Sequence, residues 1–286
     1  MGPGLRIVWE VLSFRVRRFE MANLAASLTL LVALRSAWPD ALVRMGLGLA
    51  LNLLAYLIND YLDVDRDLAD GRCPDHTRYL AEHRGSALGA MAALGSGSAA
   101  AALLWEPTLL GVAVAGVGIC WLYSRWLKAM PYVDVAAMIG WGMAMPLVAV
   151  PLGSVLGWVL IAELGLFSAA FETIQIMRDY EADRRARLRT TAVRLGPRRS
   201  LTLVRATLVA AGLYGAAVIS VPAGLLVAGG AAVPFPPGRP AAYWQRIRLV
   251  LGTAWLFMLL EVFRHGASAG GWLRLDAGAR LFRAAA

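Results

Sequence analysis

The chain has 286 residues, of which 59% are hydrophobic and only 16% are charged, and its formal net charge is +9. It cannot form one soluble core, because apolar stretches long enough to cross a hydrocarbon layer of about 30 Å recur along it. The composition therefore predicts an all-α, polytopic membrane protein.

The first twenty residues mix four arginines with Glu10 and Glu20, which predicts an amphipathic helix on the membrane surface and no cleavable signal. Nine apolar stretches follow, each near the length of about 20 residues that a spanning helix needs. The eighth stretch, 221–234, is the shortest, and Pro234, Pro236 and Pro237 lie at its end. The predicted spans are 22–38, 41–58, 87–104, 109–127, 133–150, 155–177, 201–219, 221–234 and 248–264.

Basic residues alternate between the connections of these spans. Arginine or lysine precedes the first span and fills the connections 2–3, 4–5, 6–7 and 8–9, so the positive-inside rule places the amino terminus and these loops in the cytoplasm. Arg35 and Arg44 in the first outer connection run against this topology. The basic residues carry no nucleic-acid motif, so anionic lipid and a phosphorylated substrate are the expected partners.

No linker divides the chain, so we expect one domain over 1–286, with cytoplasmic cap loops at 59–86 and 178–200. Each cap follows an apolar helix that ends in a polar stripe with steps of three or four residues. If the two stripes face each other, they line a polar pocket with apolar walls. The first stripe contains Asn52, Tyr56, Asn59, Asp60, Asp63 and Asp67, and the second contains Glu172, Gln175, Asp179 and Asp183.

Acidic residues at a helix end are often no more than a solvated terminus. Two such clusters on one membrane side instead favour a magnesium site, because carboxylates are costly at a bilayer and Mg²⁺ takes one or two of them together with phosphate oxygens. Arginines after each cluster are available for further phosphate oxygens: Arg66, Arg72, Arg78 and Arg84 after the first, and Arg184, Arg185, Arg187 and Arg189 after the second. Lys128, the single lysine of the chain, lies between spans 4 and 5 and is a further diphosphate-binding candidate.

These motifs resemble those of the UbiA superfamily of intramembrane aromatic prenyltransferases, Asn-Asp-x-x-Asp-x-x-x-Asp and Asp-x-x-x-Asp. The resemblance extends to the stretch from Tyr123 to Lys128 and to Arg189–Gly196. The segment Arg72-Cys73-Pro74 and the surroundings of Arg187 depart from the family pattern. The resemblance implies nine helices around a central cavity under a cytoplasmic cap, and a tunnel open to lipid for a prenyl tail. It also implies site residues: Asn59, Asp60, Asp63, Asp67, Asp179 and Asp183 for Mg²⁺ and catalysis, and Lys128, Arg72, Arg66, Tyr123 and Arg189 for the diphosphate.

The first functional hypothesis is a prenyltransferase in a bacterial inner membrane that ionises a prenyl diphosphate and transfers the prenyl group to a small acceptor, expected to be aromatic. Asn52, Tyr56, Glu172 and Gln175 would line the cavity, and Glu172 is the candidate to bind or deprotonate the acceptor. A terpene cyclase of the same superfamily needs the same aspartates but no acceptor. A transporter is disfavoured, because relay acids belong at the middle of the membrane. No protein partner is expected.

Overall fold

The computed structural model describes residues 1–69, 75–236 and 238–273. Every regular element in these ranges is helical, which confirms the all-α prediction. The chain forms two compact units. Unit 1 contains 1–28, 37–127 and 144–149, and unit 2 contains 29–36, 128–143 and 150–286.

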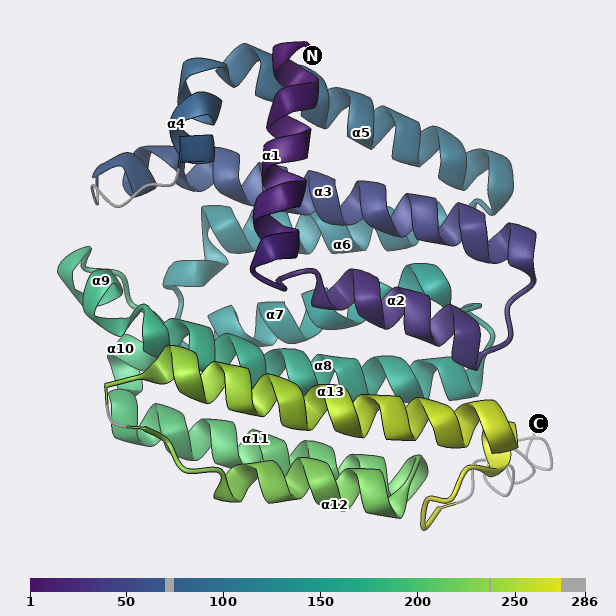
Figure 1. The fold of residues 1–286 in the computed structure, drawn as a ribbon. Helices are drawn as coiled ribbons and strands as arrows, with labels where there is room; N and C mark the ends of the chain where they lie inside the picture. Colours follow the sequence, from purple (N-terminus) through teal and green to yellow (C-terminus); the bar gives the residue numbers. More distant parts are fainter. Residues whose placement is uncertain (70–74, 237, 274–286) are drawn as a thin grey trace. The chain divides into compact units, whose positions relative to one another are not determined.

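In unit 1, α3 packs against α5 and α6, while α1 crosses α3 and contacts α4 and α5 (Figure 1). Ile7 and Val11 of α1 are buried against Leu57, Val64 and Leu80. The amino-terminal helix therefore closes a hydrophobic core at the C-terminal end of α3. The face of α1 that carries Ile7 and Val11 is therefore covered by protein, whereas Leu5, Trp9 and Val16 are exposed. The helices of unit 1 are α1 (Pro3–Arg17), the first part of α2 (Ala22–Ala33), α3 (Trp38–Ala69), α4 (Asp75–Glu82), α5 (Arg84–Trp105), α6 (Thr108–Arg125) and η2 (Pro146–Ala149).

In unit 2, α8 packs against α11 and α13, and α11 lies beside α12 (Figure 1). Two glycines permit this last approach: a Cβ on Gly212 would lie 2.5 Å from the nitrogen of Ala228, and one on Gly224 would lie 2.2 Å from that of Ala216. The helices of unit 2 are α7 (Val133–Ala144), α8 (Val155–Arg178), α9 (Tyr180–Arg185), α10 (Thr191–Leu195), α11 (Pro197–Val218), α12 (Val221–Gly229), η3 (Gly230–Ala232), α13 (Pro240–His265) and η4 (Gly266–Ser268). The short turn η1 (Leu127–Ala129) lies where the chain passes from unit 1 to unit 2.

Five helices in the described ranges are long and apolar enough to cross a membrane, namely α3, α5, α6, α8 and α11. Shorter apolar segments cover 22–33, 133–149 and 221–232, and α13 covers the ninth predicted stretch. The count of nine spans therefore stays a prediction. The second predicted span, 41–58, lies within α3, which continues as one helix to Ala69 and carries the whole first acidic motif.

Arg44, which ran against the predicted topology, is buried in a network near the start of α3. Its guanidinium contacts Asp40 at 2.8 Å and also Glu106, and it donates to the Val148 carbonyl at 3.0 Å. The Trp105 indole donates to Asp40 at 2.8 Å. An arginine paired with two carboxylates is no longer a free positive charge, which explains the exception to the positive-inside pattern.

Candidate functional site

The first acidic motif occupies the last turns of α3, where the periodicity separates buried from exposed carboxylates. Asp60 and Asp63 are 8% and 6% exposed, whereas Asp67 is exposed. Asn59 donates to the Ser124 hydroxyl of α6 at 2.9 Å and lies 3.4 Å from an oxygen of Asp63. The packing of α3 on α6 thus orients the motif, and the predicted polar stripe exists on one continuous helix.

Arg15 of α1 enters this cluster, although the sequence predicts no site role for any residue of the amino-terminal helix. Its guanidinium forms an ion pair with Asp60 and another with Glu20 at 2.8 Å. It also lies 4.7 Å from the ring centroid of Tyr56, whose hydroxyl donates to the Glu20 carbonyl. The only available signal was a run of arginines next to a glutamate at the end of α1.

His76 of α4 lies on the other side of Asp60, with its Nε2 atom 3.9 Å from a carboxyl oxygen. The imidazole packs on Phe14 of α1 at a centroid distance of 4.2 Å. Burial, followed by the positive charge of Arg15, lowers the pKa of His76 below its usual value. A neutral imidazole is therefore expected at pH 7, and Arg15 is the positive charge that balances Asp60.

The oxygen atoms of this cluster suit Mg²⁺, a hard cation that prefers carboxylate and phosphate oxygens. One oxygen of Asp60 is buried and has no hydrogen bond from any described residue, so it is free to accept a ligand. No group of three or more histidine, cysteine or acidic side chains arranged to hold a metal occurs in the described ranges. Asp60 and Asp63 therefore fit a magnesium ion that also takes phosphate oxygens, and they do not form a complete protein cage.

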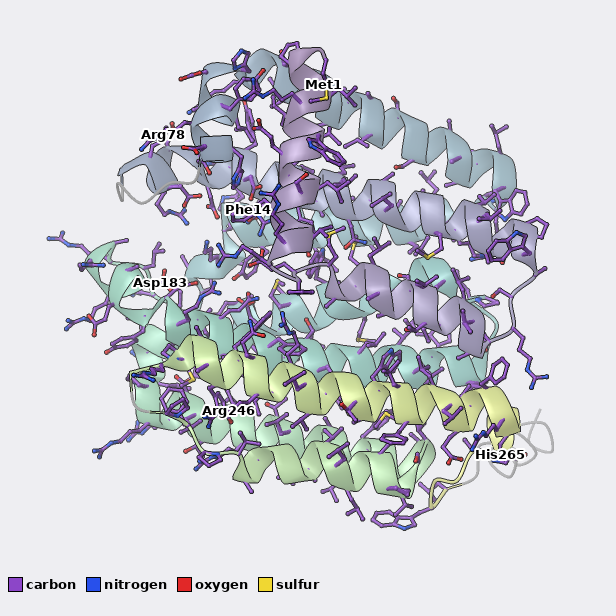
Figure 2. All side chains as sticks on the ribbon, viewed as in Figure 1. Met1, Phe14, Arg78, Asp183, Arg246 and His265 are labelled. Atoms are coloured by element: carbon purple, nitrogen blue, oxygen red, sulfur yellow. The ribbon has the colours of Figure 1, made fainter. Side chains whose placement is uncertain are left out.

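The second acidic motif lies where α8 ends and α9 begins. Asp179 caps the end of α8, is exposed, and pairs with Arg178 at 3.2 Å. Asp183 lies on α9 (Figure 2). It is 8% exposed, and its backbone N–H donates to the Asp179 carbonyl at 2.9 Å. The one-turn spacing therefore places a buried and an exposed carboxylate on consecutive turns.

The other predicted site residues divide between the two units. In unit 1, Tyr123 is buried on α6, Arg66 pairs with Asp63 at 3.1 Å, and the amide of fully buried Asn52 donates to the Gly48 carbonyl at 2.8 Å. Their functional roles stay predictions. In unit 2, Glu172 is buried and Gln175 half-buried on α8, Lys128 is half-buried in η1, and Arg189 is exposed. Arg72 lies outside the described residues, and Arg78 is exposed on α4 (Figure 2).

The fold and the two acidic motifs define a helical integral membrane protein with clustered carboxylates at the ends of α3 and α8. Residues 22–265 match the UbiA prenyltransferase family, and the chain belongs to this family. The resemblance inferred from the motifs is thereby confirmed.

Solved structures with the same fold support this assignment. The chain resembles a structure described as digeranylgeranylglyceryl phosphate synthase in membranes, with 13% identity, a TM-score of 0.73, and coverage of 92% of this chain and 100% of that one. It also resembles a UbiA homologue from Archaeoglobus fulgidus bound to DMAPP and Mg²⁺, with 16% identity, coverage of 99% and 94%, and a TM-score of 0.59. The apo structure of a homologue from Aeropyrum pernix K1 shares 21% identity over 92% of this chain and 98% of that one, with a TM-score of 0.53. No curated protein matches the chain by sequence.

Proposed function

We propose that the protein is a magnesium-dependent prenyltransferase that ionises a prenyl diphosphate and transfers the prenyl group to a small aromatic acceptor. The observation that carries the proposal is the pair Asp60 and Asp63, two buried carboxylates one turn apart on a membrane-spanning helix. Such groups are costly in a bilayer unless an ion or partner compensates them. Family membership, and the Archaeoglobus fulgidus homologues solved with DMAPP or GPP and Mg²⁺, support the same chemistry.

Bound Mg²⁺ would neutralise the diphosphate oxygens and stabilise the negative charge that grows on them as the leaving group departs. Asp60, Asp63 and Asp67 on α3 and Asp179 and Asp183 in unit 2 are the proposed ligands. Asn59 orients its neighbouring carboxylate through the hydrogen bond with Ser124. Lys128, Tyr123, Arg66 and Arg189 are the described candidates for oxygens that the metal leaves uncovered, and Arg72 remains a candidate from its position in the sequence.

Glu172 is the candidate group for the acceptor, because it is a buried carboxylate on α8 that lies about 10 Å along the helix from Asp179. It can accept a hydrogen bond from an acceptor hydroxyl and hold the proton lost on substitution. Asn52, Tyr56 and Gln175 are proposed to line the substrate cavity. The protein is further proposed to lie in a bacterial inner membrane, with the reaction on the cytoplasmic side and lipid around its apolar faces.

Product analysis tests this proposal directly. Purified protein in detergent is incubated with Mg²⁺ and geranyl, farnesyl or geranylgeranyl diphosphate, with and without 4-hydroxybenzoate as a probe acceptor. The expected result is diphosphate release and a prenylated acceptor only when the acceptor is present. A defined cyclic hydrocarbon or alcohol without acceptor would instead make the protein a terpene cyclase. Failure to release diphosphate from all three donors, with or without acceptor, would contradict both activities.

A further inference from the structure

Asp134, in the first turn of α7, is fully buried and binds a segment distant in the sequence. One carboxyl oxygen accepts the Thr191 N–H at 2.6 Å. The other accepts the Thr191 hydroxyl and the Val135 N–H, the latter at 2.8 Å. Three donors therefore converge on one carboxylate, and hydrogen bonds to an ionised acceptor are stronger than neutral ones.

Thr191 closes the contact from the other side. Its hydroxyl oxygen accepts the N–H of Tyr132 at 2.6 Å, so both ends of the segment 132–134 are bound to one threonine. Tyr132 has φ +70°, in the left-handed region that non-glycine residues occupy at a cost. The neighbouring Thr190 caps α10 by accepting the Val193 N–H at 3.3 Å. These contacts compensate the strained backbone and fix the segment that follows η1.

The two segments joined in this way both carry residues of the proposed site. Lys128 lies in η1, shortly before Tyr132, and Thr191 is the first residue of α10, directly after the loop 186–190 that follows α9 and its Asp183. That loop is itself closed by the Leu188 N–H, which donates to the Asp183 carbonyl at 2.9 Å. Asp134 is therefore the link between the Lys128 turn and the second acidic cluster, all within unit 2.

We propose that Asp134 is a positioning residue for diphosphate binding, because its carboxylate holds the Lys128 turn in a fixed place relative to the loop 186–190, which follows α9 and its Asp183. It touches no substrate atom and acts through the backbone that it anchors. The inference rests on the proposed function, since it assigns Lys128 to the diphosphate.

Three variants separate this role from a general contribution to stability. Asp134→Asn must turn an amide N–H towards either the Thr191 or the Val135 N–H, so it loses the clamp without changing the size of the side chain. Thr191→Val removes the hydroxyl from both of its hydrogen bonds but keeps its backbone donor. Thr191→Ser keeps all of these groups and is the matched control.

The expected kinetic result is a KM for the prenyl diphosphate raised about tenfold in Asp134→Asn and several-fold in Thr191→Val, with kcat changed less than KM. Thr191→Ser should behave as the unmodified protein. A lower thermal midpoint with unchanged KM in the folded variants would show that the clamp only stabilises the fold, and would overturn the proposal. If Asp134→Asn does not fold, Thr191→Val alone decides the question.

A second readout does not depend on catalysis. Because Lys128 is the single lysine, endoproteinase Lys-C has one cleavage site in the chain, and the rate of cutting there reports the mobility of the Lys128 turn. Loss of the clamp should accelerate this cleavage about tenfold in Asp134→Asn, with Thr191→Ser unchanged and Lys128→Arg resistant. Unchanged cleavage in both Asp134→Asn and Thr191→Val would overturn the inference. Accelerated cleavage in these variants of a protein that shows no prenyl transfer would instead refute only the proposed function.

Discussion

Arg15 on α1 forms an ion pair with Asp60 on α3, and the two residues are 45 positions apart in the chain. Both side chains are largely buried, with 15% and 10% of their surface exposed. Asp60 is one of the carboxylates proposed for Mg²⁺, so Arg15 compensates its negative charge when no metal is bound. Under the proposed metal assignment, Mg²⁺ binding and the packing of α1 are therefore coupled through the carboxylate of Asp60.

Arg15→Gln should destabilise the metal-free protein by about 3 kcal/mol, because removal of one member of a buried pair leaves the other charge uncompensated. Mg²⁺ should then raise the thermal midpoint of the variant more than that of the unmodified protein, since the ion supplies the missing positive charge. Thermal unfolding in detergent, with Mg²⁺ and with EDTA, measures both effects. Arg6→Gln is the control, because Arg6 lies on the same helix but at the surface, where it pairs with Glu10 at 2.7 Å and lies 4.1 Å from the centroid of the Tyr79 ring. Equal losses in the two variants would contradict the coupling.

Asp63→Ala and Asp179→Ala should each abolish diphosphate release, with a loss of at least about a thousandfold, because each removes a charge that the leaving group requires. The proteins should remain folded and monodisperse in detergent. Asp65→Ala and Glu181→Ala are matched controls: Asp65 lies in the same motif but is exposed and paired with Arg84, and Glu181 is exposed and paired with Arg184. Release assays with a radiolabelled donor give the comparison, and near-normal turnover in both aspartate variants would refute the metal assignment.

Lys128→Ala should raise the KM for the prenyl diphosphate about tenfold while lowering kcat by less, because a point charge on phosphate oxygens contributes mainly to binding. Lys128→Arg should retain part of the affinity, since the positive charge remains. Initial-rate kinetics over a range of donor concentrations at saturating Mg²⁺ provide the test. A large fall in kcat with an unchanged KM would place the lysine in the chemical step instead.

Arg44→Met should lower stability by about 2 to 3 kcal/mol, because it leaves the Val148 carbonyl without its donor and Asp40 and Glu106 without their shared cation. Arg44→Lys should recover only part of the loss, since an ammonium group cannot reach three acceptors in the geometry of a planar guanidinium. Thermal unfolding of the two variants and the unmodified protein in detergent ranks their stabilities. Equal stability of the methionine variant and the unmodified protein would show that the network is not stabilising.

The sequence predicted what local patterns determine. Runs of apolar residues marked the helices, and steps of three or four residues placed Asp60 and Asp63 on one face of a helix, because side-chain direction follows from helical geometry. The charged residues in the last turns of α3 reduce hydropathy without breaking the helix, so the predicted apolar span 41–58 is shorter than the helix that contains it. Charged residues therefore mark the end of the apolar stretch in α3, but they do not mark the end of the helix.

Contacts between distant segments were not predictable in the same way. Arg15 meets Asp60 across 45 positions and Asp134 meets Thr191 across 57, and nothing in the residues near either partner specifies the other. Arg44 illustrates the converse: its position contradicted the charge rule, and only its two carboxylate partners explain it. Packing decides such pairs, so they emerge from the structure alone.

Glu163 of α8 is fully buried, and neither of its carboxyl oxygens receives a hydrogen bond from a described residue. A Cβ on Gly215 of α11 would lie 3.1 Å from one of these oxygens, so the glycine leaves room for the carboxyl group. Glu163→Leu should therefore stabilise the protein by about 1 to 3 kcal/mol, because it removes a buried polar group that has no partner and adds apolar contacts. Ile161→Leu, a fully buried apolar exchange on the same helix, controls for repacking and should change stability little or lower it slightly. Thermal unfolding in detergent measures all three proteins. A less stable Glu163→Leu protein would show instead that the carboxyl group has a stabilising partner, such as an ordered water.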